Sequence, residues 1–374
     1  MRLLHTGDLH IGKKMGARPL LADQEHILGQ ILEVIREYQV SALLISGDVY
    51  DRSVPPEDAV KLVDTFLADL AAAHVAVCII PGNHDSADRL SFAKTFLEHA
   101  HIYIAGPYDG TVDAVQLADD VIVYLLPHLK IQPVKLQYPD LNISTLDDAV
   151  RAVVDDIQLD AGKTNIIMAH QFVVNGAEKP EISESETHFA GNIEEISASI
   201  FSRFDYTALG HLHKPQSIGL PAIRYSGSPL KYSASETGHV KSVSLIDTDT
   251  HTVTEIPLKP LHDVRRVRAT LDTLADTEGS HEDYVYVVLT DDVPDMKTQE
   301  KVEQVFPNFL EIRREIIAGT RAERALSSSD LKTRDPETIF ADFYQMQFGE
   351  PLSSYQQETV RRIFTELSEG DGQP

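Results

Sequence analysis

Residues 42–51 read ALLISGDVYD and residues 75–85 read VAVCIIPGNHD, two apolar runs that each lead into a glycine and then polar residues. The apolar run at 2–7 ends in the same way. Between these runs, the segments at 20–38 and 57–73 carry apolar residues at helical spacing. Short buried strands that alternate with helices predict an α/β fold with a largely parallel sheet.

The middle of the chain predicts a more mixed arrangement of strands. Further strands are expected at 121–126, 165–169 and 206–209, and a hairpin at 241–258. The polar loop at 175–192, with its SESET segment, is long enough to predict a mobile loop that contacts substrate.

The length of 374 residues exceeds the ~250–300 residues that a single core usually covers, so we expect several domains. We predict four parts in chain order: a core at 1–260, a small α/β domain at 264–317, a polar linker at 318–335 and a helix pair at 336–374.

Composition narrows the class of protein. Lysine and arginine number 33 against 58 aspartate and glutamate, a net charge of −25, which taken alone argues against a basic nucleic-acid footprint. Bound cations would change the field locally. A single cysteine excludes an internal disulfide and a cysteine-rich zinc site.

No apolar run approaches the ~20 residues that a membrane span needs. Asp8 interrupts the apolar stretch that a signal peptide would require. We therefore expect a cytoplasmic protein without membrane contact.

Five polar motifs each follow a strand-like run. They are Asp8-Leu9-His10, the segments at 47–51 and 82–85, Ala169-His170-Gln171, and the segment at 210–213. Because ligand sites of open α/β sheets form beyond the carboxyl ends of the strands, these motifs are expected in one pocket. Imidazole, carboxylate and amide oxygen suit first-row divalent metals better than Mg²⁺ or Ca²⁺. Each motif alone is a weak signal, but the series predicts a two-metal phosphoesterase.

The series DLH…GDVYD…GNHD…H…GHLH resembles that of the calcineurin-like metallophosphoesterase superfamily. The sequence IRYSGSPLKYS at 223–233 and the C-terminal region are most similar to the SbcD branch, the nuclease subunits of bacterial SbcCD complexes. This resemblance covers essentially the whole chain. It implies two mixed sheets flanked by helices, a 264–317 domain that caps the site and positions DNA, and a 336–374 helix pair that binds an SMC-like ATPase.

The resemblance also implies a role for each matching residue. The first metal would be held by Asp8, His10, Asp48 and His213. The second would be held by Asp48, Asn83, His170 and His211, with Asp48 bridging both. His84 would protonate the leaving oxygen, and the Asp51 carboxylate would pair with His84; archaeal and eukaryotic relatives carry histidine at the position of Asp51. Arg52, Lys13 and Lys14 are candidates for contact with the phosphate backbone, with ordinary solvated side chains as the alternative.

The first functional hypothesis is therefore a Mn²⁺-dependent DNA nuclease, active as a 3′→5′ exonuclease on double strands and an endonuclease on single strands. The resemblance implies a homodimer paired with the ATPase in DNA repair. ATP would act through that partner, because this chain has no GxxxxGK[ST] loop. The second hypothesis is a phosphatase or small-molecule phosphodiesterase on the same core, which would not need residues 264–374. A third is a scaffold that bridges an ATPase dimer, and the intact set of metal-binding side chains argues against it.

Overall fold

The computed structural model describes most of the chain, which divides into two compact units, Met1–Glu315 and Ile316–Pro374. The described residues are 1–176, 178–186, 195–291, 296–315, 336–348 and 351–370. No helix in these ranges has the length and hydropathy that a membrane span requires.

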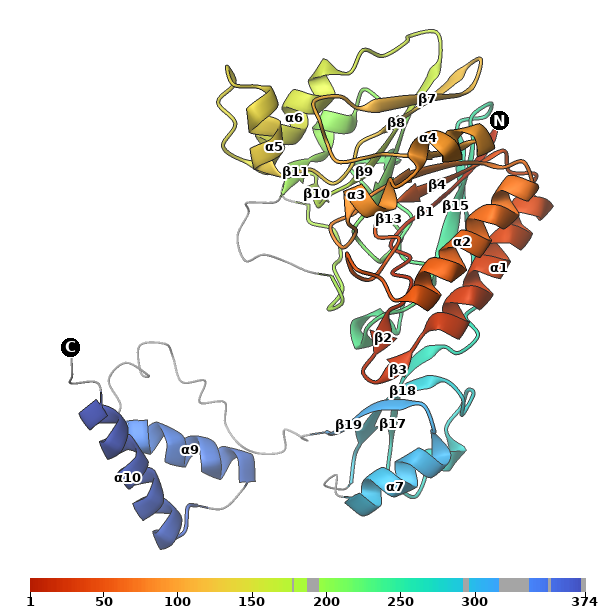
Figure 1. Cartoon of the computed structure of the whole chain (residues 1–374). Helices are drawn as coiled ribbons and strands as arrows, with labels where there is room; N and C mark the ends of the chain where they lie inside the picture. The colour runs from red at the N-terminus through yellow and green to blue at the C-terminus, as the bar shows by residue number, and fades with distance from the viewer. Residues whose placement is uncertain (177, 187–194, 292–295, 316–335, 349–350, 371–374) are drawn as a thin grey trace. The chain divides into compact units, whose positions relative to one another are not determined.

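The first unit is built on two six-stranded mixed sheets (Figure 1). In spatial order, the first sheet contains β16 (Thr252–Pro257), β15 (Ser242–Asp247), β1 (Arg2–Thr6), β4 (Ala42–Ser46), β5 (Ala76–Ile80) and β6 (Ile102–Ile104). Strands β1, β4, β5 and β6 are parallel, whereas β15 and β16 form an antiparallel hairpin against β1. The parallel part is the one that the alternating strands and helices of the sequence predict.

The second sheet has the same mixed character. Its strands are, in spatial order, β13 (Gln216–Ile218), β14 (Leu220–Tyr225), β12 (Tyr206–Gly210), β9 (Thr164–His170), β8 (Val121–Leu125) and β7 (Asp113–Ala118). The central strands β14, β12, β9 and β8 are parallel, and β13 and β7 are antiparallel edges.

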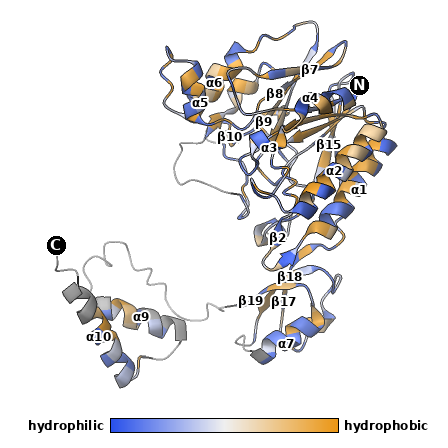
Figure 2. Cartoon of the chain, in the orientation of Figure 1, coloured by the Kyte–Doolittle hydropathy of each residue, from blue (hydrophilic) through white to orange (hydrophobic). Residues whose placement is uncertain are grey.

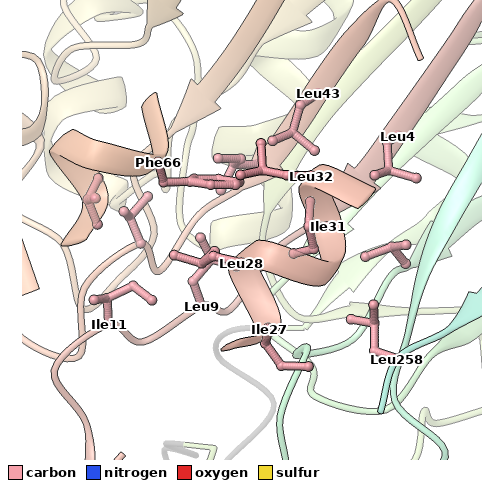
Figure 3. Packing of buried hydrophobic residues seen from close by; sticks show 14 of the residues in the cluster. Leu4, Leu9, Ile11, Ile27, Leu28, Ile31, Leu32, Leu43, Phe66 and Leu258 are labelled. Carbon is pink, nitrogen blue, oxygen red and sulfur yellow. The ribbon is translucent and has the colours of Figure 1, made fainter. Parts of the chain in front are cut away.

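The two sheets pack face to face with helices outside them. Leu44 and Cys78 of the first sheet and Met168 and Ala208 of the second belong to one buried apolar layer. The outer face of the first sheet is covered by α1 (Leu21–Glu37) and α2 (Glu57–Ala72), whose apolar side chains form one buried cluster with Leu4 and Leu43 of the sheet (Figures 2 and 3). The outer face of the second sheet is covered by α5 (Ile131–Gln137) and α6 (Leu146–Asp156).

The remaining elements of the first unit are short or belong to a third sheet. The three-stranded parallel sheet consists of β17 (Val264–Ala269), β18 (Tyr284–Leu289) and β19 (Phe309–Arg314). Helix α7 (Met296–Val305) packs on it through Val302, together with Phe306, which follows the helix. The short elements are β2 (Lys14–Met15), β3 (Arg18–Pro19), α3 (Ala87–Leu90), α4 (Lys94–Leu97), β10 (Val173–Val174), β11 (Ile196–Ser197) and 3₁₀ turns at 98–100, 198–201, 234–236 and 274–276.

The second unit contains α9 (Pro336–Phe348) and α10 (Ser354–Gly370). The rings of Phe340 and Phe364 meet edge to face, with centroids 6.4 Å apart. At the start of α10, the Gln356 backbone N–H donates to Ser353 Oγ and the Ser353 N–H donates to Gln356 Oε1, which forms a reciprocal capping box.

The strands, helices and hairpin expected from the sequence are confirmed, as are the two mixed sheets flanked by helices that the resemblance implies. Helices α3 to α6 are additional. The linker at 318–335 lies outside the described residues, and the loop at 175–192 is described only in part. The domain boundaries stay predictions.

Candidate metal centre

Five loops that leave the carboxyl ends of β1, β4, β5, β9 and β12 carry the predicted site residues. Because these strands run side by side in two packed sheets, their loops meet at one edge of the sandwich. The structure brings together seven side chains there, and most are fully buried: Asp8, His10, Asp48, Asn83, His170, His211 and His213.

The backbone is strained where these side chains leave the strands. Asp8 has φ 53°, His10 φ 45°, Asp48 φ 50° and His211 φ 104°, all in the left-handed region that residues with a Cβ atom rarely adopt. Such conformations cost about 1–3 kcal/mol each and persist where the surroundings hold them in place for a function. Here they turn four donor side chains toward a common centre.

Glycines at 47 and 82 allow the loops to approach closely. A Cβ atom on Gly47 would lie 2.2 Å from His170 Nδ1, and one on Gly82 would lie 2.1 Å from Asp48 Oδ1. Any side chain at either position would therefore displace a candidate ligand.

The first group of candidate ligands is Asp8, His10, Asp48 and His213. Nε2 of His10 lies 3.2 Å from Nε2 of His213 and 3.7 Å from Oδ2 of Asp48. Asp8, His10 and His213 each offer a ligand atom, and these atoms lie within 4.8 Å of one another. Both Asp8 oxygens also accept the His211 backbone N–H, at 2.9 and 3.1 Å, which fixes the carboxylate.

The second group is Asp48, Asn83, His170 and His211. Asn83 Oδ1 lies 2.9 Å from His170 Nε2 and 3.2 Å from His211 Nδ1. Asp48 Oδ2 lies 3.4 Å from His170 Nε2, so the Asp48 carboxylate stands between the two groups, as a bridging ligand would.

The charges of the groups around His170 are suited to a cation. Burial would lower the pKa of His170, but the carboxylates of Asp48 and Asp8 outweigh burial and raise it to about 9. Nδ1 of His170 donates to the Ser46 carbonyl at 2.8 Å, so its proton-bearing Nε2 faces the acceptors Asn83 Oδ1 and Asp48 Oδ2. A metal ion in place of that proton would satisfy all three atoms, so these residues fit a cation.

The remaining histidines favour the neutral form that a metal ligand needs. Burial lowers the pKa of His10, His211 and His213 below its ordinary value. Imidazole, carboxylate and amide donors are the set that first-row divalent metals prefer. The arrangement can therefore hold a pair of such ions around Asp48.

His84 lies beside the centre, but its partner differs from the expected one. His84 Nδ1 donates to the backbone carbonyl of Asp51 at 2.9 Å, not to the Asp51 carboxylate. The carboxylate is drawn away because it accepts from Lys13 Nζ at 2.8 Å and lies 3.6 Å from Arg52 Nη2. The carbonyl still fixes the His84 tautomer and leaves Nε2 for a substrate. By distance alone, His84 could also join His10 and Asp48 around an ion.

The other predicted contact residues differ in how exposed they are. Lys13 is partly buried, with Nζ 5.5 Å from the centroid of the Tyr232 ring. Lys14 is exposed on β2, and Arg52 is largely exposed beside Asp51.

Sequence reasoning missed three acids that support the ligands, of which Glu186 and Glu236 are buried and Asp85 is partly buried. The Asp85 carboxylate accepts the backbone N–H groups of Val49, Tyr50 and Gly82 at 3.0–3.1 Å, which ties the loop after β4 to the loop after β5. Burial raises the pKa of Asp85 to about 6. Asp85 is part of the GNHD motif, so its place in the motif was the available signal. Glu186 and Glu236 contact His213, but the sequence carried no signal for them, because they lie in polar segments.

We expect Mn²⁺ to raise the melting temperature of the chelator-treated chain, because ions that bind only the folded state stabilise it, by about 2.7 kcal/mol at a hundredfold excess over Kd. Asp48→Asn should lose this increase, since it removes the bridging charge while keeping the side-chain shape. Differential scanning fluorimetry with and without Mn²⁺ measures the effect, with the exposed Asp58→Asn as control. An undiminished increase in Asp48→Asn would contradict the bridging position.

Comparison with known proteins agrees with this site. Residues 1–215 match the calcineurin-like phosphoesterase family, and residues 260–348 match the type 5 capsule protein repressor C-terminal domain. The chain is 28% identical to the SbcD subunit of nuclease SbcCD from Staphylococcus epidermidis over 382 residues, covering 100% of both chains. It is 30% identical to the SbcD subunit of nuclease SbcCD from Staphylococcus saprophyticus over 378 residues, covering 99% of each.

Among solved structures, a dimetal phosphatase from Danio rerio is 13% identical, with a TM-score of 0.39, over 66% of this chain and 91% of that one. This likeness is too remote to bear on the site. The family assignment depends on the match over residues 1–215 and on the full-length relatives. The chain belongs to the calcineurin-like phosphoesterase family, in the branch formed by the SbcD subunits of SbcCD nucleases.

Proposed function

We propose that this chain is the Mn²⁺-dependent DNA nuclease subunit of a cytoplasmic SbcCD-type complex. The observation that carries the proposal is the cluster of imidazole, carboxylate and amide ligand atoms around Asp48, with His84 beside it. The full-length likeness to the SbcD subunits of SbcCD nucleases supports DNA as the substrate.

Each residue of the centre would have a defined task. Asp8, His10 and His213 would hold one ion, Asn83, His170 and His211 the other, and Asp48 both. The ions, when bound, would polarise the phosphodiester and supply an activated water for in-line attack. His84 is held by two hydrogen bonds. Its backbone N–H donates to Asp48 Oδ1 at 2.9 Å, and its ring Nδ1 donates to the Asp51 carbonyl. Its Nε2 would protonate the leaving oxygen.

Cations next to His84 would contact the substrate backbone. Lys13 and Arg52 both lie beside the Asp51 carboxylate. Asp51 would thus act by holding Lys13 in place near the scissile phosphate. This role replaces the pairing with His84 that the resemblance implies.

The 264–317 domain would extend this DNA-binding surface. Arg266 and Arg268 are exposed on β17, and Arg313 and Arg314 are exposed on β19. Arg18, on the short strand β3, donates to the Pro307 carbonyl and so connects this domain to the core. Exposed guanidinium groups would provide phosphate contacts despite the overall charge of −25, although Arg268 and Arg313 also pair with Glu315 and Glu311.

The substrate class is tested by measuring cleavage of two phosphodiesters, duplex DNA and a small ester, by the same chain. With Mn²⁺ present, we expect release of nucleotides from end-labelled duplex DNA and little turnover of bis(p-nitrophenyl) phosphate. Chelation should stop the reaction. Turnover of the small ester alone, even with the ATPase subunit added, would favour the small-molecule phosphodiesterase.

We also propose an SMC-like ATPase of the SbcC type as partner, bound through the helix pair at 336–374, and a homodimer of this chain within the complex. The full-length relatives are named as one subunit of a complex, SbcCD, which supports the partner.

A surface suited to the homodimer lies next to the centre. Phe92 and Phe96, around α3 and α4, are 80% and 82% exposed, and Val54 is 62% exposed. Arg89 of α3 donates to the Ser53 carbonyl, which places Val54 beside α3. Two large aromatic rings left in water at this spacing favour burial against a second copy.

We expect Phe92→Glu combined with Phe96→Glu to convert the dimer into a monomer, because each buried aromatic ring contributes about 1.5–3 kcal/mol. Multi-angle light scattering measures the mass directly. Leu136→Glu on α5, where the side chain is 79% exposed, is the matched control. A dimer that survives the double substitution would place the interface elsewhere.

A further inference from the structure

The ring of His213 has contacts on the side opposite to the candidate metal. Its Nε2 faces His10 Nε2, whereas its Nδ1 lies 2.9 Å from Ser185 Oγ. Ser185 Oγ in turn donates to Glu236 Oε1 at 2.6 Å. A chain of three groups, from His213 through Ser185 to Glu236, therefore leads away from the centre.

The direction of the hydrogen bonds in this chain follows from what each group can donate. The Glu236 carboxylate only accepts, so the single Ser185 hydroxyl proton points toward Glu236. Ser185 Oγ must then accept from His213, which places the His213 proton on Nδ1. The lone pair of Nε2 is thereby directed at the site of the first metal.

Glu236 is a fixed anchor for this chain. It is fully buried, and its Oε2 accepts from Lys241 Nζ at 2.6 Å. Oε1 also accepts from Ser233 Oγ at 2.9 Å and from the Tyr232 N–H at 3.2 Å. This buried ion pair with the Lys241 ammonium keeps the group a carboxylate.

Lys241 connects the anchor to the backbone of the same ligand. Besides Glu236, its Nζ donates to the His213 carbonyl at 2.8 Å and to Ser228 Oγ at 2.9 Å. The His213 N–H donates to Glu186 Oε1 at 2.6 Å. His213 is thus held at its ring, its N–H and its carbonyl.

We propose that Ser185 and Glu236 are positioning residues for His213, which fix its Nδ1–H tautomer and ring orientation and thereby set the affinity of the first metal ion. This inference rests on the proposed two-metal function and deepens it. Outer partners of this kind typically change metal affinity about 10- to 100-fold.

Ser185 is the better residue to test. Replacing Glu236 would leave the Lys241 ammonium buried without its partner and endanger folding. Ser185 lies in the partly exposed segment before residue 187, so losing its hydroxyl costs the fold little. Ser185→Ala removes the nearer acceptor of His213 Nδ1 and leaves only the longer contact with Glu236 Oε1, at 3.5 Å, whereas Ser185→Thr keeps a hydroxyl there.

Ser233→Ala is a matched control. Like Ser185, Ser233 donates a hydroxyl to Glu236 Oε1, but no hydrogen bond joins it to His213 among the contacts of the described residues. Ser233→Ala therefore removes the same kind of hydrogen bond from the Glu236 carboxylate and leaves the contacts of His213 in place.

Titration calorimetry with Mn²⁺ on the four full-length, chelator-treated proteins tests the proposal. We expect two ions in the unsubstituted chain, one bound about 10- to 100-fold more weakly in Ser185→Ala, and affinities restored in Ser185→Thr and unchanged in Ser233→Ala. Two ions bound with unaltered affinities in Ser185→Ala, or equal weakening in Ser233→Ala, would overturn it. Failure of the unsubstituted chain to bind two ions would instead refute the proposed function.

Discussion

His84→Ala should abolish metal-dependent cleavage of DNA while both ions remain bound. His84 is placed to protonate the leaving oxygen, and removing a positioned general acid costs about 100- to 10,000-fold in rate. The substitution spares the ligand set, because the contact of residue 84 with Asp48 is made by its backbone N–H, at 2.9 Å from Oδ1. Alanine keeps that N–H, so the bridging carboxylate stays in place.

The measurement pairs cleavage of end-labelled duplex DNA with metal content after removal of free Mn²⁺, determined by plasma mass spectrometry. DNA binding, followed by fluorescence anisotropy, should stay near that of the unsubstituted chain. His99→Ala is a matched control, since His99 is exposed and its Nδ1 donates only to the Thr95 carbonyl of its own turn among the described contacts. Loss of one ion from His84→Ala would make His84 a ligand, in the group that it forms with His10 and Asp48.

The sequence predicts the fold well where local pattern and global topology agree. The strand at 42–46 is buried at every position, so it reads as a continuous apolar run, and α1 shows its buried face at helical spacing. Helices α3 and α4 have four residues each and no buried side chain, so they leave no periodic signal. The assembly of the second sheet depends on pairings between distant segments, which a local pattern does not encode.

The residues of the candidate metal centre were likewise predictable only in part. Asp8, Asp48 and His211 each follow a strand within a short motif, so sequence order alone predicts that they meet. The partners behind them come from segments that carry no motif: Ser185 and Glu236 are 28 and 23 residues from His213 and reach it only through the fold. The position of the Asp51 carboxylate was equally hidden, because it depends on Lys13, 38 residues away.

The helix pair of the C-terminal unit is the subject of the second prediction with a large expected effect, on binding of the ATPase subunit. Among the described residues, the apolar clusters of the first unit consist of residues within 1–315, so this unit has a core of its own. Helices α9 and α10 contact one another through Phe340 and Phe364 and through a hydrogen bond from Gln356 Nε2 to Tyr344 Oη at 2.9 Å. Tyr355 and Ile363 of α10 nevertheless remain 79% and 47% exposed. An amphipathic hairpin with apolar side chains left in water is suited to helix-to-helix contact with a partner.

Deleting residues 336–374 should therefore eliminate co-purification with the ATPase subunit and leave Mn²⁺-dependent cleavage by the isolated chain intact. Tyr355→Asp combined with Ile363→Asp should weaken the complex without truncation, because each places a charge in an apolar contact, and Arg362→Asp on the same helix serves as the control. Pull-down from cells that express both subunits measures binding, and the duplex DNA assay measures cleavage. Retention of the ATPase by the truncated chain would place the docking site within residues 1–335, whereas loss of cleavage would show that the helix pair supports the nuclease itself.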